Sequence, residues 1–194
     1  MAASDQRLIA EALRGSEDAY RALVERYQRP VLGLVLRIVR ERGLAEDLAQ
    51  ETFVKAFGAL ATFQVERKFS SWLFKIAHNA AIDALRRRRL DTLPLETADA
   101  DRPDLLDFLP GPATDSPATA LEARDLGAAL AAAIAALKPE HRSAVELRFV
   151  QGLAYEEIAD VLDLPLGTVK THLHRARKKL METLSAGGWQ PAGG

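Results

Sequence analysis

Five prolines and six acidic residues fall within residues 92–120, near the middle of this 194-residue chain. The prolines are Pro94, Pro103, Pro110, Pro112 and Pro117. Because proline removes a backbone donor and clashes with the preceding helical turn, repeated prolines prevent a continuous helix, and this stretch shows no sustained helical periodicity. We therefore interpret residues 92–120 as a flexible acidic linker between domains at 1–91 and 121–185, with a disordered tail at 186–194.

Alanine and leucine dominate the apolar residues, whereas aromatic residues make up only 6% of the chain. Unbranched side chains lose little rotamer freedom in a helix, so this composition favours helices over sheets. The absence of cysteine excludes a disulfide framework and a thiolate zinc site, and it favours a reducing cytoplasm. No signal core is present in residues 1–11, and no window approaches the roughly 20 apolar residues of a membrane span. We expect an all-α, soluble protein of two small helical domains.

The net charge of −1 conceals an uneven distribution. Residues 1–91 carry 16 Lys and Arg against 12 Asp and Glu, whereas residues 92–120 carry 1 against 6. Residues 121–194 carry 9 of each sign. The total argues against a simple nucleic-acid binder, but basic surfaces remain available on both sides of the acidic linker.

Apolar periodicity and capping residues predict the helices. In the first half, Ser16 and Glu17 open a helix, Pro30 starts the next, and Gly43 ends it. Further helices are expected at 44–60 and from about 70 to 89, with Ser70 as an N-cap. In the second half, helices are expected at 121–137, 139–150, 155–162 and about 167–184.

The last two of these helices have the lengths and the tight turn, residues 163–166, of a helix-turn-helix. Val169, Leu173, Ala176 and Leu180 form one narrow apolar stripe on the second helix. Its other side carries cations and no acid, which suits attraction to phosphates and contacts with base edges. Ala154 stands where a Ser or Thr cap normally satisfies the first helix, an omission that typically costs about 1 kcal/mol.

Histidines offer little support for a metal site or an enzyme. His172 and His174 are two apart on a helix and point about 200° away from each other, so they cannot share an ion. His78, Asp83 and His141 are candidate catalytic groups, but no paired spacing, nucleotide loop or metal cluster accompanies them. We expect no cofactor, no metal and no catalytic residues.

Three segments carry a resemblance to a known family. LAYEEIADVLDLPLGTVKTHLHRARKKL resembles the helix-turn-helix of sigma factors, and its TVKTHL core also resembles the output domain of LuxR-type regulators. Upstream, AEDLAQETFVKAF and FSSWLFKIAHNAAIDALRRRR resemble the polymerase-binding and promoter-melting segments of extracytoplasmic function (ECF) sigma factors. Because these matches occur in the family's order around a linker, the resemblance covers most of the chain. It implies a sigma-2-like domain followed by a sigma-4-like domain.

The helix at 44–60 has an acidic face with an apolar centre, opposite a face formed by Leu48, Thr52 and Phe53. Such a surface suits docking on a basic partner helix. The resemblance identifies that partner as the clamp coiled coil of core RNA polymerase. The expected polymerase-binding residues are Glu46, Asp47, Gln50, Glu51 and Val54.

The helix from residue 70 carries a basic strip with one amide, on the side away from its apolar stripe. Asn79 suits a base edge, and the cations suit phosphates. The resemblance assigns this strip to the minus-ten element, and the loop at 62–68 is the expected pocket for an extruded base. Nearby Phe63, Phe69 and Trp72 are interpreted mainly as core residues. The expected minus-ten residues are Lys75, Asn79, Arg86, Arg87, Arg88 and Arg89.

In the second domain, the expected minus-thirty-five residues are Arg148, Thr168, Lys170, Thr171, His174, Arg175 and Lys178. The resemblance also implies the polymerase flap, promoter DNA and an anti-sigma factor as partners, in a stress or envelope response. The alternative is a LuxR-like regulator that reads DNA without replacing a sigma factor. A receiver domain would require strands before the linker, and no convincing strand is predicted there.

Overall fold

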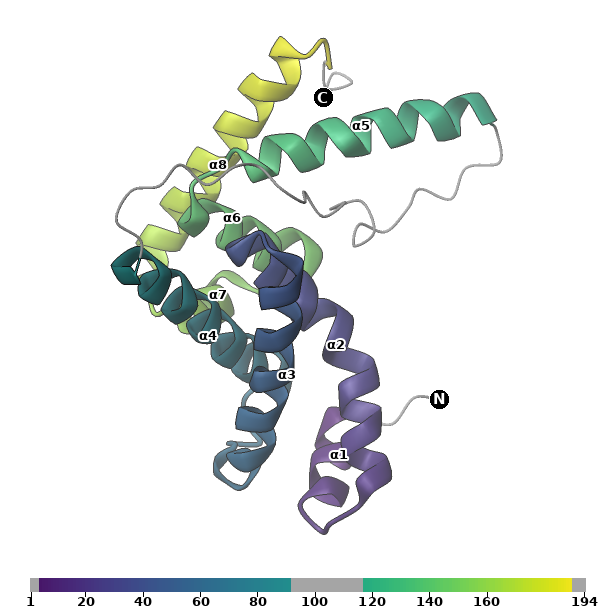
Figure 1. The fold of residues 1–194 in the computed structure, drawn as a ribbon, viewed down its shortest axis with the longest axis vertical. Coiled ribbons are helices and arrows are strands. Elements are labelled where there is room, and N and C mark those ends of the chain that lie inside the picture. The colour runs from purple at the N-terminus through teal and green to yellow at the C-terminus, as the bar shows by residue number, and fades with distance from the viewer. Residues whose placement is uncertain (1–3, 92–116, 190–194) are drawn as a thin grey trace.

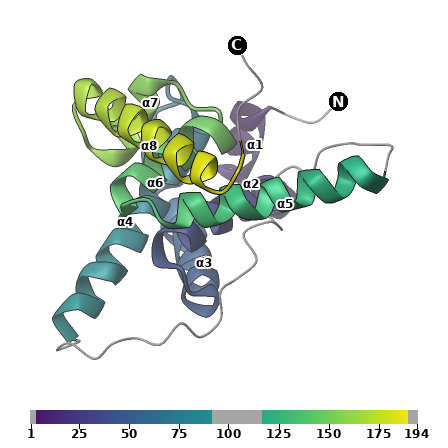
Figure 2. The ribbon, with the colours of Figure 1, turned by 90° about the horizontal axis from the view of Figure 1, so that it is seen from above.

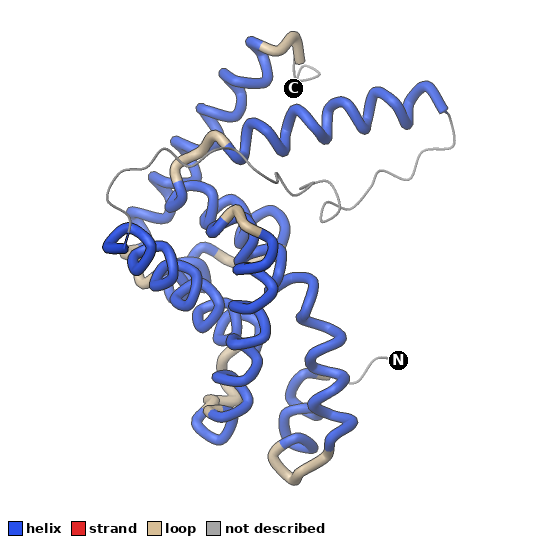
Figure 3. Tube along the Cα trace, viewed as in Figure 1, coloured by secondary structure: helices blue, strands red, loops and turns tan. Residues whose placement is uncertain are grey.

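The computed structural model describes residues 4–91 and 117–189, and this part of the chain consists of helices and connecting turns without a strand (Figure 3). The helices are α1 (Asp5–Ala12), α2 (Glu17–Val39), α3 (Arg42–Gly58), α4 (Phe69–Asp91), α5 (Pro117–Ala135), α6 (Pro139–Val145), α7 (Tyr155–Leu162) and α8 (Leu166–Ala186). A 3-10 turn, η1 (Leu60–Thr62), follows α3, and a π-helical turn, η3 (Glu146–Val150), continues α6. The expected all-α fold is confirmed. Within these residues, no helix combines the length and apolar composition that a bilayer crossing requires.

Helix α1 was not predicted from the sequence. The Ser4 side chain caps it by accepting a hydrogen bond from the Arg7 amide at 3.3 Å. Leu8, Ile9 and Ala12 are buried against the rest of the bundle. Asp5 fixes the helix further, because its carboxylate accepts hydrogen bonds from Arg26 and Tyr27 of α2. A helix of only 8 residues owes its stability to such tertiary contacts, which a sequence pattern does not show.

Helix α2 runs without a break through Pro30, so the predicted helix start at this residue is wrong. Proline leaves the carbonyl four residues earlier without its helical partner, but the buried stripe continues in phase on both sides of it. Arg40, and not Gly43, ends the helix: it adopts φ 61° and donates its amide to the Leu36 carbonyl at 2.8 Å. Gly43 instead lies in the first turn of α3.

Helices α2, α3 and α4 pack on one another and form the core of the N-terminal half. Thr52 is fully buried on α3, where its hydroxyl donates to the Leu48 carbonyl at 2.7 Å. Helix α4 begins at Phe69, so Ser70 is its second residue and not its N-cap. Phe69 packs edge-on against both Tyr27 and Phe63, with ring centroids 5.5 and 5.6 Å apart. Core packing therefore accounts for Phe69, as the sequence indicated.

The C-terminal half begins earlier than expected, because residues 117–120 of the predicted linker belong to α5. The rest of that linker, residues 92–116, lies outside the described residues. Helix α7 has the predicted bounds, and Asp163 follows it with φ 55° before the chain turns into α8. Trp189 donates its amide to the Leu184 carbonyl at 3.0 Å, so residues 186–189 of the predicted tail are ordered, and residues 190–194 lie outside the described residues.

The two halves pack directly against each other. Helix α7 packs on α4, and α6 packs on the end of α2, where Arg142 donates to the Arg37 carbonyl (Figure 1). The buried apolar residues form one continuous cluster that includes Leu34 and Phe74 from the first half and Leu147 and Ile158 from the second. Helix α5 extends away from this body in both views (Figures 1 and 2). The two sets of candidate DNA-binding residues therefore belong to one packed molecule.

Candidate nucleic-acid interface

Helix α8 presents the cationic face that the sequence predicted. Val169, Leu173 and Ala176 are buried, and Leu180 is half-buried. The opposite side exposes a set of polar and basic side chains: Lys170, Thr171, His174, Arg175 and Lys178. Thr168, one turn earlier, is half-buried. The structure therefore brings six of the seven expected minus-thirty-five residues onto one helix, and five of these six are exposed.

The seventh residue, Arg148, lies in η3 and contacts the segment that leads into α7, the first helix of the helix-turn-helix. Its guanidinium stacks 5.0 Å from the centre of the Tyr155 ring and donates to the Leu153 carbonyl at 2.9 Å. The residue is half-buried. These contacts hold the segment between η3 and α7 in place, so Arg148 has a structural role whether or not it also reaches DNA.

Glu157 makes one of the two bonds of a capping box at the start of α7. Its carboxylate accepts a hydrogen bond from the Ala154 amide at 2.7 Å and lies 2.9 Å from the Lys68 ammonium. Partial burial opposes ionisation of this carboxyl, but the Ala154 amide and Lys68 outweigh it and hold the pKa of Glu157 below its usual value. This bond satisfies the Ala154 amide, whereas Ala154 has no side-chain oxygen to cap the first-turn amides of α7, as the sequence indicated.

The acidic face of α3 is exposed as the sequence predicted. Asp47 and Gln50 are exposed, and Val54, at the centre of the face, is 72% exposed. Glu46 and Glu51 are half-buried and pair along the helix, with Arg42 at 2.9 Å and Lys55 at 2.5 Å respectively. Single exposed apolar residues are common on protein surfaces, so this exposure does not by itself identify a binding face.

The basic strip of α4 is partly engaged within the molecule. Asn79 is exposed, whereas the half-buried Lys75 lies 3.9 Å from the Asp163 carboxylate. Arg86 lies 3.8 Å from Asp83, and the exposed Arg87 donates to the Asp83 carbonyl at 3.4 Å. Arg88 reaches Glu41 at 2.6 Å. The side chain of Arg89 lies outside the described residues.

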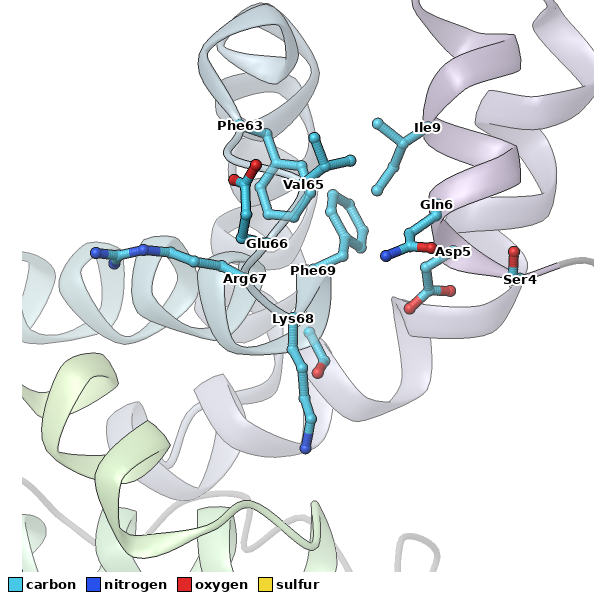
Figure 4. Close-up of a pocket in the computed structure, with 11 residues that line it drawn as sticks. Ser4, Asp5, Gln6, Ile9, Phe63, Val65, Glu66, Arg67, Lys68 and Phe69 are labelled. Atoms are coloured by element: carbon cyan, nitrogen blue, oxygen red, sulfur yellow. The ribbon is translucent and has the colours of Figure 1, made fainter.

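A pocket of about 270 Å³ opens between α1 and the loop that precedes α4 (Figure 4). Phe63, Val65 and Ile9 supply apolar walls, and Asp5, Gln6 and Glu66 supply polar ones. Figure 4 shows the Lys68 side chain pointing away from these apolar groups. The pocket lies at the loop that the sequence predicted, but its second wall comes from α1, which the sequence analysis missed.

A buried charge cluster between the two halves was also missed. The Arg37 guanidinium of α2 lies 2.8 Å from the Glu146 carboxylate of η3, and both side chains are almost fully buried. Burial raises the pKa of Glu146, although Arg37 and a hydrogen bond from Gln151 oppose this shift. Arg142 donates to the Arg37 carbonyl at 2.6 Å and to the Leu137 carbonyl at 2.9 Å. Nothing in the sequence distinguishes these charged residues from exposed ones.

The histidines of α8 are separated, as their spacing predicted. His174 is exposed, whereas His172 is half-buried with its ring centroid 5.1 Å from that of His141. Burial, together with the nearby His172, lowers the pKa of His141. The part of the chain that the structure describes holds no group of three or more His, Asp or Glu placed to share a metal ion.

Comparisons with known proteins agree with the arrangement of the two halves. The family model for Sigma-70 region 2 matches residues 23–90, and the model for Sigma-70 region 4 matches residues 127–180. The RNA polymerase sigma-H factor of Pseudomonas aeruginosa is 36% identical over 186 residues, which cover 93% of each chain. The ECF RNA polymerase sigma factor SigW of Bacillus subtilis is 31% identical, over 92% of this chain and 96% of its own.

Two solved structures have similar folds. CnrH, solved in complex with the cytosolic domain of CnrY, is 26% identical, with a TM-score of 0.64 over 94% of this chain and 97% of its own. The sigma factor RpoE of Bartonella quintana, solved in complex with the anti-sigma factor NepR, has a TM-score of 0.61 at 22% identity. The second match covers 86% of this chain and 96% of the RpoE chain, and it shows similarity of fold.

Proposed function

This chain belongs to the ECF sigma factors of the sigma-70 family, and we propose how its residues divide the work of directing transcription initiation. As a sigma factor it is not an enzyme; the polymerase performs the chemistry. The observation that carries the proposal is that one chain presents three chemically distinct exposed faces. These are the acidic face of α3, the basic strip of α4 and the cationic face of α8.

The face of α3 docks core RNA polymerase. Val54 supplies apolar surface at the centre, and the surrounding carboxylates orient the helix on a basic partner such as the clamp coiled coil. Docking by a domain that spans residues 1–91 also places α4 next to the melted DNA. The acidic linker would follow the polymerase surface toward the flap, where the domain at 121–185 binds upstream.

The strip of α4 and the adjoining pocket bind the minus-ten element as a single strand. Asn79 offers an amide to a base edge, and the arginines from Arg86 onward neutralise phosphates. The pocket beside Phe63 is of a size and composition suited to one extruded base, with apolar walls for stacking and polar groups for its edge.

The cationic face of α8 reads the minus-thirty-five duplex. The N-terminal half of such a helix enters the major groove, so Lys170, Thr171, His174 and Arg175 contact base edges. Lys178 lies further along and binds phosphate. Thr168 at the helix start donates to the DNA backbone, and Arg148 acts chiefly by holding the motif together through its contacts with Leu153 and Tyr155.

We also propose an anti-sigma factor as a partner, and a role in a stress or envelope response. The support is that two structures of similar fold were solved as complexes, CnrH with the cytosolic domain of CnrY and RpoE with the anti-sigma factor NepR. The protein would act in the cytoplasm, where bacterial RNA polymerase is found.

A transcription assay with purified components tests this proposal. Core polymerase freed of other sigma factors is mixed with the protein and a library of promoter fragments, and transcripts are sequenced. Selective initiation by core plus this protein alone supports the sigma-factor role. A LuxR-like regulator would instead give selective transcripts only when a second sigma factor is added, and that result would contradict the proposal.

A further inference from the structure

Two histidine rings meet where α6 packs on α8. His141 lies in the first turn of α6 and His172 in the second turn of α8, and both side chains are half-buried. Their ring centroids are 5.1 Å apart, and the ring planes are inclined by 60°. Because the rings come from different helices, the spacing of histidines along the sequence does not predict this pair.

The separation of the rings matches that of two imidazoles on one metal ion. Two imidazoles that bind a tetrahedral ion through Zn–N bonds of about 2.0 to 2.1 Å have their ring centres roughly 5 Å apart. Aromatic rings that simply pack on each other also occur at this distance. The distance is therefore compatible with a shared ion, and the chemistry of the two rings decides between the alternatives.

The His172 ring has a nitrogen that lacks a partner. Its Nδ1 atom is buried and makes no hydrogen bond within the described residues. Leaving a buried polar atom unsatisfied is unfavourable, and in a folded protein such an atom is normally bonded to water, to an ion or to another polar group. A neutral imidazole nitrogen is the commonest metal ligand in proteins. An ion shared with His141 would therefore satisfy the Nδ1 atom.

The pair supplies two protein ligands and not more, because no third His, Asp or Glu of the described residues is placed to share an ion with them. Lys138 and Arg175 add positive charge near His141, whereas Glu140 adds negative charge. All three are exposed, so solvent and salt weaken their influence on a bound ion. Water would complete the coordination, and we expect weaker binding than at a zinc site closed by four protein ligands.

We propose that His141 and His172 together bind one Zn²⁺ ion, or a similar divalent ion that prefers imidazole ligands, and that this ion ties α8 to α6. His174 takes no part, because it is exposed and lies on a different side of α8. Neither His141 nor His172 is among the residues assigned to DNA above. The proposal therefore does not depend on the proposed function of α8.

Nuclear magnetic resonance of the untagged full-length protein tests the site directly. The chain has four histidines, so the ring nitrogens of each can be followed separately during a titration with Zn²⁺. We expect the signals of His141 and His172 to shift together and to saturate at one ion per chain. The ring signals of His78 and His174 should keep their positions.

Three variants measure the contribution of each ring to the affinity for Zn²⁺. His141→Gln and His172→Gln each remove one of the two ligands, so calorimetry should show a loss of at least about tenfold. His174→Gln is the matched control on an exposed site of α8, and its affinity should equal that of the parent. Circular dichroism confirms that each variant folds. The titration of the parent stands even where His172→Gln fails to fold.

The tie between α6 and α8 is measured by unfolding in urea with and without Zn²⁺. An ion that binds only the folded protein, at about one hundred times its dissociation constant, lowers the equilibrium constant for unfolding about a hundredfold. The parent and His174→Gln should show this stabilisation, and His141→Gln should not.

Ring signals of His141 and His172 that do not respond to millimolar Zn²⁺ would show that the two rings only pack on each other, and would overturn the site. A joint shift of His172 and His174, or equal affinities of all three variants, would assign the ion to other surface groups and overturn it as well. Binding at the pair without any gain in stability would overturn the tie between the helices.

Discussion

Arg37 of α2 and Glu146 of η3 form an ion pair with 2.8 Å between guanidinium and carboxylate, and their side chains are only 3% and 1% exposed. The pair joins two halves that the sequence predicted to be separate domains. A buried pair of this kind contributes little net stability over apolar residues of the same size, because desolvation offsets the attraction. Removal of one member of the pair is costly, since the remaining charge stays buried without an opposite charge beside it.

Arg37→Met should therefore weaken the association of the two halves by about 3 to 5 kcal/mol. Arg37→Met combined with Glu146→Leu should recover most of that loss, because neither charge then remains. Spin labels on cysteines introduced at the exposed positions Gln28 and Met181 report the distance between the two halves. The urea concentration at which this distance increases gives the loss in the single variant and the recovery in the double variant. Equal shifts in the single and double variants would show that the pairing itself does not matter.

His78 gives the protein a pH dependence with a definite sign. Burial lowers the pKa of His78 from 6.5 to about 4, so the folded protein holds this imidazole neutral. Because the pKa is higher in the unfolded chain, the contribution of His78 to stability is complete above about pH 6.5 and is lost as the pH falls toward 4. The loss is up to about 3 kcal/mol, from 1.36 kcal/mol per pKa unit.

His78→Met should remove the contribution of His78 to the pH dependence. The free energy of unfolding of this variant should therefore fall less than that of the parent between about pH 7 and about pH 4.5. Exposed His174 provides the control, and His174→Met should follow the parent curve. Denaturant unfolding at several pH values measures the difference. Parallel curves for parent and His78→Met would mean that another group causes the acid sensitivity.

Reversing charge on the exposed side of α3 should weaken polymerase binding. Asp47→Lys with Glu51→Lys places two cations against the expected basic partner, and we expect at least about a tenfold loss of affinity, or ~1.4 kcal/mol. Asp18→Lys with Glu25→Lys makes the same charge change on exposed sites of α2. Fluorescence anisotropy with core polymerase measures binding, and circular dichroism confirms folding. Similar affinities for the two double variants would place the docking surface elsewhere.

Within α8, we expect Arg175 to determine sequence preference and Lys178 to contribute affinity alone. Arg175→Ala should cost about 1 to 3 kcal/mol and relax the preference at one minus-thirty-five position. Lys178→Ala should weaken all sequences about equally and reduce the salt slope by roughly one unit. Binding of the full-length variants to randomised duplexes at several salt concentrations distinguishes the two effects. A uniform loss for Arg175→Ala, with the preferred sequence unchanged, would contradict this division.

The buried and exposed faces of the helices were predictable because apolar residues recur in the sequence with the period of the α-helix. Leu48, Phe53, Leu173 and Ala176 are buried as their spacing indicated, and the polar residues Gln50, His174 and Arg175 between them are exposed. The bounds of α7 were also correct: the tight turn at residues 163–166 marks its end, although Ala154 gives no capping signal at its start.

Features that depend on tertiary contacts were not predictable. Pro30 signals a helix start, yet burial on both sides of it keeps α2 continuous. Helix α1 depends on Asp5 meeting Arg26 and Tyr27, and thus on a contact between different helices. The Arg37–Glu146 pair depends on the two halves packing together, which periodicity within each helix cannot report.

The central claim is that α4 and α8 of one chain read two different elements of the same promoter. Start sites selected by core polymerase with this protein, from a library randomised at both elements, test it most directly when Asn79→Ala and Arg175→Ala are compared with the parent. We predict that Asn79→Ala changes only the preferred downstream element and Arg175→Ala only the upstream one. If both variants alter the same element, or neither alters any preference, the account is contradicted.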